Sequence, residues 1–569
     1  MAEATESIGQ RRLSRRLFLR GSALTVGSVA MGGLLAACAQ QPPPAQTAAP
    51  AKPAESKPAE SKPVGQPAAT QPAPQSQPPA TVAPTAGGKP ITFVEGTDVT
   101  TLDPTLVSDT PTWTAINLLY DTLVTWDPNM KLVPLLAAKW ATSDDRKTWT
   151  FDLRPGVKFS DGSPFNAEAV KYSVERTLKP ETGSVVRAIF EGIVDKVEPG
   201  GENQVKITTK NPYPDLLTVL ASPSAAMYSP SATEKYDVKE YGRNPVGTGP
   251  YMVKEWTTGE RLVMVPNPSF WGEKPRTPQI TYRPIPEAAT RAALLRTGEA
   301  DIVVKLPPEE IRNLESAPNV DVLRLDSMYQ ISFELHVEKD DPPLKDKRVR
   351  QALNYAVDKE AISKSILQDL GAPIRSPFGP GIDFRVEQEP YKYDPARAKQ
   401  LLTEAGYPNG FKMELWSPQG RYLKDGEISE AVQGYLKAVG IDAGLRIWEW
   451  APYTQAVRQD ATRQAMMLGR ATPGADFFVT RLFTKGAIGQ FNSTGFTTEK
   501  TEDLIPKARS TFDESERAQL YREIQATVWD EAPWIFLYNQ KALVGTRKDV
   551  QGFGMWSHEV MLLRDVAKS

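Results

Sequence analysis

One short stretch of the sequence places a charged side chain next to a turn. Residues 466–478 read MMLGRATPGADFF, in which an apolar run stops at Gly469 and Arg470 follows. The Pro-Gly pair that comes next is typical of turns, so the stretch predicts a strand end that leads into a loop. An arginine can bind a carboxylate or a phosphate through two parallel hydrogen bonds, and it can stack on a flat ring. Asp476 adds an acid to the same loop, so either charge is a candidate to face a ligand.

Residues that would support catalysis or metal binding are scarce. The chain has one cysteine, Cys38, and two histidines, His336 and His558. These numbers exclude an intrachain disulfide and argue against a histidine-rich metal site, so we expect no metal and no cofactor. The many Asp and Glu residues leave a secreted carboxylate-based hydrolase as an alternative hypothesis, although no pair of them stands out by its position. His558 lies near the C-terminus and is most simply a surface residue.

Two tryptophans are further candidates for ligand contact. Trp448 and Trp450 alternate along the run AGLRIWEW, which predicts that they share one face of a strand. They are ligand-binding residues if that face lines a cleft, and core residues if it does not. The sequence leaves both interpretations open.

The composition is that of a globular protein with more than one domain. The chain has 569 residues, of which 40% are hydrophobic and 24% are charged. Its formal net charge is −2, which gives no electrostatic reason to expect a nucleic-acid partner.

The beginning of the chain has the pattern of an export signal followed by a tether. Residues 14–20, SRRLFLR, place a twin-arginine pair ahead of a short apolar run that ends in LLAAC at 34–38. This ending is similar to a bacterial lipobox and predicts a signal peptide over 1–37 and a lipid on Cys38, the alternative being a weak membrane helix. Residues 38–89 are rich in proline and alanine and lack aromatic residues, which predicts a disordered linker. We therefore expect an extracytoplasmic, lipid-anchored protein, on the periplasmic side or the outer face of the cell membrane.

From residue 90 onward, strand-like and helix-like segments alternate, which indicates an α/β fold. ITFVEG at 91–96 is apolar and β-branched, and TWTFDLRPG at 148–156 alternates apolar and polar residues as a half-buried strand does. YDPARAKQLLTEAG at 393–406 carries clear helix signals, with Asp394 as N-cap, a proline in the first position and a glycine at the end. Several further helical patterns are each followed by a strand-like run.

Seven stretches resemble, in the same order, the extracytoplasmic solute-binding proteins of peptide/nickel-type ABC importers, and in particular the oligopeptide- and dipeptide-binding proteins. No single stretch is decisive, but together they cover roughly residues 90–560. The stretches are TTLDP (100–104), TWTFDLRPGVKFSDGSPFNAEAVKYSVER (148–176), GTGPY (247–251), NPSFWG (267–272), LRTGEADIV (295–303), PPLKDKRVRQALNYAVDKEAI (342–362) and YDPARAKQLLTEAGYPNGF (393–411).

The resemblance implies a two-lobed clamshell of mixed sheets flanked by helices, in which closure of the lobes buries the ligand. It implies lobe I with an extra subdomain at 90–280, lobe II at 281–535 and a C-terminal return to lobe I at 536–569. The crossovers are expected near Thr281 and Phe536. The resemblance also implies a monomer without enzymatic activity that delivers its ligand to a membrane permease. A role in chemoreception stays open beside transport.

The resemblance also suggests which residues contact the ligand. In the family, the residues just ahead of the LDP turn present backbone groups to a peptide, and here these are Asp98, Val99 and Thr100. At the position of Arg470, peptide-binding relatives carry an aspartate, because a buried ligand ammonium needs a counter-charge. Arg470 would repel an ammonium and suits an anionic group, unless it points to solvent. Asp476 would restore the acid if the loop folds back.

These residues leave the class of ligand open. A peptide or peptide-like solute is the first hypothesis, because the resemblance is to peptide-binding proteins. An oligosaccharide or an anionic opine-like solute is the second, because of the arginine in the loop and the two tryptophans before it.

Overall fold

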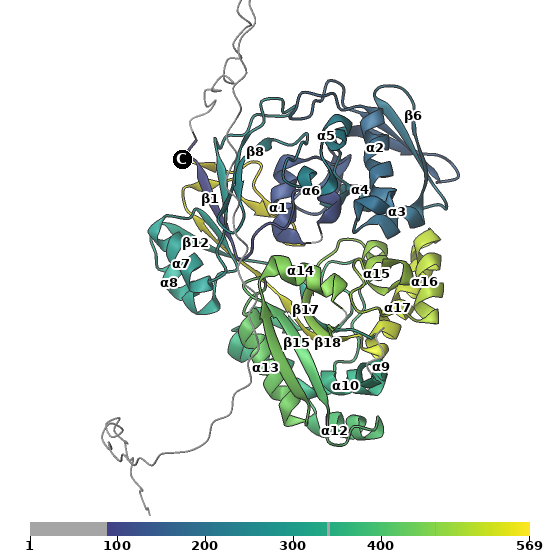
Figure 1. The fold of residues 1–569 in the computed structure, drawn as a ribbon, viewed down its shortest axis with the longest axis vertical. Helices are drawn as coiled ribbons and strands as arrows, with labels where there is room; N and C mark the ends of the chain where they lie inside the picture. Colours follow the sequence, from purple (N-terminus) through teal and green to yellow (C-terminus); the bar gives the residue numbers. More distant parts are fainter. Residues whose placement is uncertain (1–87, 108, 338–341, 461) are drawn as a thin grey trace, which may run out of the picture. The chain divides into compact units, whose positions relative to one another are not determined.

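The computed structural model describes residues 88–107, 109–337, 342–460 and 462–569 of the chain. These residues belong to one compact unit, Thr81–Ser569, which forms two lobes, each built on its own β-sheet with helices packed around it (Figure 1). The predicted α/β class and two-lobed architecture are therefore confirmed. The signal peptide predicted at 1–37, Cys38, and all but the end of the linker predicted at 38–89 lie outside the described residues.

Lobe I is built on a seven-stranded sheet whose centre is the first strand of the lobe. β1 pairs in parallel with β10 on one side and with β11 on the other. Its apolar sequence fits this place, because a central parallel strand is covered on both faces. The sheet runs in the order β12 (Val320–Leu325), β19 (Ala542–Arg547), β11 (Ile302–Val304), β1 (Ile91–Glu95), β10 (Ile280–Pro284), β9 (Arg261–Pro266) and β8 (Tyr251–Thr257).

The extra subdomain of lobe I contains a four-stranded antiparallel sheet. Its strands β4 (Ala137–Thr142), β5 (Thr148–Leu153), β7 (Gln204–Thr209) and β6 (Val194–Pro199) lie in that order. The predicted alternation along β5 is confirmed, since Trp149, Phe151 and Leu153 are buried and their neighbours are partly exposed. The helices of lobe I are α1 (Thr110–Leu119), α2 (Ala167–Leu178), α3 (Arg187–Ile193), α4 (Leu216–Ala221), α5 (Pro230–Lys235), α6 (Val238–Tyr241), α7 (Ala288–Thr297) and α8 (Ile311–Glu315).

Lobe II is built on a six-stranded sheet. It runs in the order β14 (Gly371–Pro373), β18 (Trp534–Gln540), β13 (Gln330–Leu335), β17 (Ala465–Arg470), β15 (Lys412–Pro418) and β16 (Asp442–Trp448). β15 pairs in parallel with both of its neighbours, whereas β13 pairs antiparallel with both of its own.

The helices of lobe II follow the sequence signals closely. In α12 the side chain of Asp394 caps the first turn by accepting a hydrogen bond from the backbone of Arg397, and Gly406 beyond its end has a positive φ of 94°. The helices are α9 (Pro342–Lys345), α10 (Lys347–Ala356), α11 (Lys359–Ala361), α12 (Pro395–Glu404), α13 (Asp425–Ala438), α14 (Trp450–Gln459), α15 (Ala475–Phe483), α16 (Glu499–Ser510) and α17 (Glu514–Glu531).

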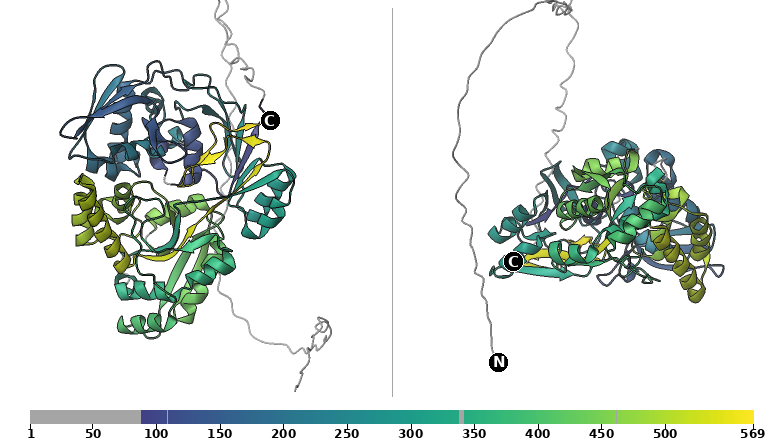
Figure 2. Two further views of the ribbon diagram at one scale, coloured as in Figure 1. Left: turned by 180° about the vertical axis from the view of Figure 1, so that it is seen from behind. Right: turned by 90° about the horizontal axis from the view of Figure 1, so that it is seen from below.

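The crossovers between the lobes lie elsewhere than predicted. The segment from β10 to β12 belongs to the sheet of lobe I, so the chain first passes into lobe II at 326–329 and not near Thr281. It returns at Lys541, between β18 and β19, and not at Phe536, which lies inside β18. The alternation of strand and helix is the same in both lobes, so it did not reveal which sheet a strand joins. Figure 2 shows the C-terminal segment, in yellow, passing from one lobe to the other.

The remaining strands form small two-stranded pairs. These are β2 (Val124–Trp126) with β3 (Leu132–Pro134), β20 (Val550–Gln551) with β23 (Ala567–Lys568), and β21 (Gly554–Met555) with β22 (Met561–Leu562). None of the helices in the described ranges is long and apolar enough to cross a membrane.

Candidate ligand-binding site

A cavity of about 1020 Å³ lies between the two lobes and is lined by both. Lobe I contributes the loop after β1, the helix α6 and Trp256, and lobe II contributes α14 and Gln490. A smaller cavity of about 50 Å³ shares Thr454, Arg458 and Gln490 with the large one, so the two form one site with a narrow inner end. This size and place between domains suit a small solute or a short peptide.

Arg421 is the most unusual residue at the inner end. It comes from lobe II and is only 1% exposed. Its Nη2 donates hydrogen bonds to the hydroxyl of Tyr329 at 2.6 Å and to that of Thr110, in lobe I, at 3.1 Å. Its Nε and Nη1 are buried and have no hydrogen-bond partner among the described residues. A guanidinium is always protonated, so the site contains a buried positive charge with two free donors.

The loop that carries Arg421 is fixed by a buried acid. The carboxylate of Asp425 accepts backbone hydrogen bonds from Gly420, Arg421, Tyr422 and Gly426, at 2.8 to 3.2 Å. Burial raises the pKa of Asp425 to about 6, and the four backbone donors act in the opposite direction. Through these four hydrogen bonds Asp425 holds the turn that directs the arginine into the site.

Gly96 and Gly469 allow the close approaches that this arrangement needs. Gly420 has a positive φ of 71°, and a Cβ on Gly96 of lobe I would meet the Gly420 carbonyl oxygen at 1.9 Å. A Cβ on Gly469 would lie 2.6 Å from the rings of both Tyr329 and Tyr422. A side chain at either site would displace the arginine loop or the rings that surround it.

Aromatic rings surround the guanidinium of Arg421. Its central carbon lies 4.7 Å from the ring centroid of Tyr422, 5.0 Å from that of Trp450 and 5.3 Å from that of Tyr329. Such contacts stabilise a desolvated cation without using its hydrogen-bond donors. The arginine is thus held in place while part of its fork stays free.

An acid of lobe I lines the same inner end. Asp109 is 4% exposed and caps α1, because its Oδ1 accepts a hydrogen bond from the backbone N–H of Thr112 at 3.0 Å. Its Oδ2 accepts one from the hydroxyl of Thr100 at 3.3 Å. Both donors are neutral, so no hydrogen-bonded cation pairs with this carboxylate within the part of the chain that the structure describes. Arg458 lines the same small cavity, and burial lowers its pKa while the charge of Asp109 acts to raise it.

Arg470 lines the inner end too, but its charge is balanced inside lobe II. Its Nε and Nη2 donate to the two carboxylate oxygens of Glu334 at 2.5 and 2.7 Å, and Nη2 also reaches the hydroxyl of Ser493 at 3.1 Å. Burial acts to lower the pKa of Arg470, and the Glu334 carboxylate outweighs burial, so the pKa is raised. The arginine neither points to solvent nor offers a free pair of donors.

Asp476 does not restore an acid to the site. It lies in the first turn of α15, is fully buried and is absent from the lining of both cavities. Its carboxylate accepts hydrogen bonds from the hydroxyl of Tyr213, in lobe I, at 2.7 Å and from Nε of Arg509 at 3.1 Å. Thr480 in the same helix donates a third at 3.2 Å. Asp476 is therefore engaged in a contact between the lobes, away from the cavity.

Of the three residues ahead of the LDP turn, only Thr100 lines the large cavity. Its backbone N–H donates to the hydroxyl of Thr112 at 3.1 Å. The carboxylate of Asp98 accepts the backbone N–H of Gly259 at 2.6 Å, in the turn between β8 and β9, and Val99 packs into the core.

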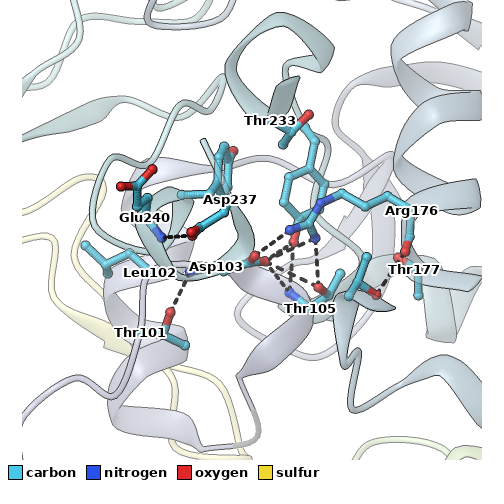
Figure 3. A network of polar contacts seen from close by, with 12 residues as sticks. Thr101, Leu102, Asp103, Thr105, Arg176, Thr177, Thr233, Asp237 and Glu240 are labelled. Atoms are coloured by element: carbon cyan, nitrogen blue, oxygen red, sulfur yellow. Dashed lines mark hydrogen bonds and ion pairs between the residues drawn. The ribbon is translucent and has the colours of Figure 1, made fainter. Parts of the chain in front are cut away.

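The LDP turn itself is pinned by a buried ion pair. Asp103 accepts hydrogen bonds from Nη2 of Arg176 at 2.6 Å, from the hydroxyl of Tyr228 at 2.5 Å and from the backbone of Thr105 at 3.3 Å. Figure 3 shows Arg176 and Thr105 converging on the Asp103 carboxylate. The turn therefore has a structural role, and it fixes the loop that precedes it.

The two tryptophans do not alternate along one strand. β16 ends at Trp448, and Trp450 begins α14, because Glu449 is the N-cap between them. Both rings belong to one aromatic cluster around Trp416 and Tyr453. Only Trp450 lines the site, while the guanidinium of Arg446 covers the ring of Trp448 at 3.8 Å.

His558 is not a surface residue. It is buried among the rings of Trp113, Trp126 and Trp556, and its ring stacks on that of Trp556 at 5.4 Å. Burial lowers its pKa to about 3, so the imidazole is neutral. Neither nitrogen has a hydrogen-bond partner among the described residues.

Sequence reasoning missed Arg421 and Asp109. The available signal was their place: QGRY follows β15 directly, and Asp109 directly precedes α1. Loops at strand ends are where open α/β sheets present their ligand-binding groups. The described residues contain no group of three or more His, Cys, Asp or Glu that could hold a metal ion.

A sequence profile described as bacterial extracellular solute-binding proteins, family 5 Middle, matches residues 131–490. The chain belongs to this family. It is 34% identical over 482 residues to the glutathione-binding protein GsiB of Pectobacterium atrosepticum, a match that covers 83% of this chain and 92% of that protein.

Solved structures of the family share the fold. The periplasmic binding protein DppA of Helicobacter pylori, in complex with the peptide STSA, superposes with a TM-score of 0.79 at 26% identity, covering 84% of this chain and 98% of that one. AgaA of A. tumefaciens R10, in complex with agropinic acid, gives a TM-score of 0.77 at 25% identity, covering 83% and 98%. The family consists of binding proteins, so this chain is a binding protein and not an enzyme, and the hydrolase hypothesis is wrong.

Proposed function

We propose that this chain is the solute receptor of an ABC importer, and that it captures a small anionic peptide or peptide-like solute between its lobes for delivery to a membrane permease. The observation that carries the proposal is the free pair of donors on Arg421, at the inner end of the site. Leaving buried donors of a charged group unpaired is unfavourable. A ligand carboxylate at the inner end would balance the charge of this guanidinium.

Glutathione is the first probe to use. The relatives named as glutathione-binding proteins are 33–34% identical to this chain over more than 80% of its length. Glutathione is a short peptide with more carboxylates than ammonium groups, so it suits a site that presents a free guanidinium. The DppA structure with a bound tetrapeptide supports the same class of ligand.

An anionic opine-like solute is the second candidate. AgaA with agropinic acid shows that this fold accommodates such a ligand at 25% identity. A carboxylate on Arg421 would serve both classes. Of the residues predicted from the sequence, Thr100, Arg470 and Trp450 belong to the proposed site in either case, because they line it.

The anchoring of the receptor rests on the sequence. We propose a lipid on Cys38 and a linker over 38–89 that tethers the two-lobed unit to the membrane. Metabolic labelling with a radioactive fatty acid should mark the wild-type protein and leave a Cys38→Ser variant unlabelled. A labelled variant would contradict the lipid anchor.

A thermal-shift screen tests the ligand class. The panel should contain glutathione, di- to pentapeptides, opines and neutral oligosaccharides, since a ligand that binds the folded state raises the melting temperature. We expect anionic peptides to give the largest rise, and their amidated forms, which lack the C-terminal carboxylate, to give a smaller one. A rise with oligosaccharides alone would overturn the proposal.

A further inference from the structure

A peptide with a free amino group brings a positive charge into the site, and that charge needs a partner. Burying an ammonium without a counter-charge is unfavourable by several kcal/mol. Glu334 is already taken up by both donors of Arg470, and Asp476 points into the contact between the lobes. The acid that lines the inner end without a hydrogen-bonded cation is Asp109.

We propose that Asp109 binds the ammonium group of the ligand, and that it makes the site selective for solutes with a free amino group in addition to a carboxylate. This inference rests on the proposed function, since it assumes a peptide-like ligand whose carboxylate lies on Arg421. The positive charge of an amino group is then the second charge that the ligand must carry, beside the negative charge of its carboxylate.

The role of Asp109 as a helix cap leaves room for this contact. Capping uses Oδ1, which accepts the backbone N–H of Thr112. Oδ2 accepts only the hydroxyl of Thr100, at the long distance of 3.3 Å. An ionised carboxylate has about four lone-pair sites, so it can accept further hydrogen bonds from an ammonium.

The second observation is the free arginine at the same inner end. Nη2 of Arg421 donates to the hydroxyl of Thr110, which is the chain neighbour of Asp109. The carboxylate belongs to lobe I and the guanidinium to lobe II, and both line one small cavity. A ligand that carries both charges therefore joins the two lobes, whereas a ligand without the amino group engages only the arginine.

The test compares glutathione with an analogue in which hydrogen replaces the amino group. Binding of both by the wild-type protein and by Asp109→Asn is measured by titration calorimetry. Asparagine also caps helices well, so this variant removes the charge and keeps α1. The wild-type protein should prefer glutathione by roughly 30-fold or more, in line with loss of one partner of a buried charge pair. Asp109→Asn should bind the two compounds within about threefold of each other.

Asp237→Asn is the matched control. Asp237 is an exposed N-cap of α6 in the same lobe, and its side chain accepts the backbone N–H of Glu240 in the same way (Figure 3). This variant should keep the wild-type preference. Equal binding of both compounds by the wild-type protein, or a full preference in Asp109→Asn, would overturn the role of Asp109 and leave the proposed function standing. If the wild-type protein binds neither these compounds nor any peptide of the panel, the proposed function fails and the inference fails with it.

Discussion

Two regions where the lobes meet treat buried charge in opposite ways. At the inner end of the cavity, Arg421 keeps two free donors and Asp109 has no hydrogen-bonded cation among the described residues. At the outer interlobe contact, which we define as Tyr213 and Asp215 of lobe I with Asp476, Arg509 and Arg517 of lobe II, the charges are paired. Asp476 accepts hydrogen bonds from Tyr213 and Arg509, and Asp215 forms an ion pair with Arg517.

The difference separates a contact that the protein completes by itself from one that a ligand must complete. Paired charges at the outer interlobe contact favour the closed arrangement whether or not a solute is present. Unpaired charges in the cavity are unfavourable until a solute with matching groups enters. Arg470 lines the same cavity as Arg421, but Glu334 forms an ion pair with it. Residue type alone therefore does not decide whether a charge in the cavity is paired.

The largest expected change in stability comes from a substitution at the outer interlobe contact. Asp476→Ala should lower the free energy of unfolding by about 3–5 kcal/mol, because it leaves Arg509 without its buried carboxylate. Urea unfolding measures the change. Asp503→Ala is the control, since Asp503 forms an exposed pair with Lys507 and its loss should change stability by less than about 1 kcal/mol. Equal stability of the two variants would contradict the comparison.

A substitution at the inner end of the cavity should change ligand affinity and leave the stability of the protein unchanged. Arg421→Met should weaken binding of glutathione by roughly 30-fold or more, because the ligand carboxylate loses its charged partner. Its melting temperature without ligand should not fall, since the variant removes a buried charge that lacked a carboxylate. Arg421→Lys should bind with intermediate affinity, as it keeps the charge and loses the fork. A destabilised Arg421→Met protein with full affinity would show that the arginine is structural.

His558 sharpens the comparison, because it is buried without partners and yet uncharged. Its pKa is about 3 in the folded protein and about 6.5 when unfolded, so between these values the unfolded chain binds more protons. Stability therefore falls as the pH drops below 6.5. Relative to a His558→Phe variant, the wild-type protein should lose about 1.4 kcal/mol between pH 7.5 and 5.5. Parallel curves of unfolding free energy against pH would show that the histidine is not buried in its neutral form.

The smallest effect concerns closure itself. Arg517→Met removes the partner of Asp215 at the outer interlobe contact and should disfavour the closed form by about 1 kcal/mol. All ligands should then bind about fivefold more weakly, by one common factor, because fewer molecules are competent to bind. Calorimetry with several ligands measures this. Arg522→Met, exposed on the same helix α17, is the control, and a loss confined to one ligand would place Arg517 in the binding site instead.

Local sequence patterns gave most of the secondary structure. Alternation predicted β5, and capping residues predicted α12, because these signals act within one turn or one strand. The crossovers were misplaced, since β10 to β12 have the same local pattern as strands of lobe II. The site was only partly predicted: Thr100, Arg470 and Trp450 line it, whereas Asp98, Val99, Trp448 and Asp476 do not.

The sequence by itself determined the family, the two-lobed α/β class and the presence of an arginine beside the loop at 466–478. Only the tertiary structure decided which charges are free. Glu334 lies far from Arg470 in the chain but on the neighbouring strand of the sheet of lobe II, because β13 pairs with β17, and the two side chains meet there. Asp109 and Arg421 are brought to one cavity by the packing of two lobes. Charge pairing depends on the distance between charges in space, and local sequence patterns do not encode that distance. We infer the charge of the ligand from the side chains that have no charged partner in the folded protein.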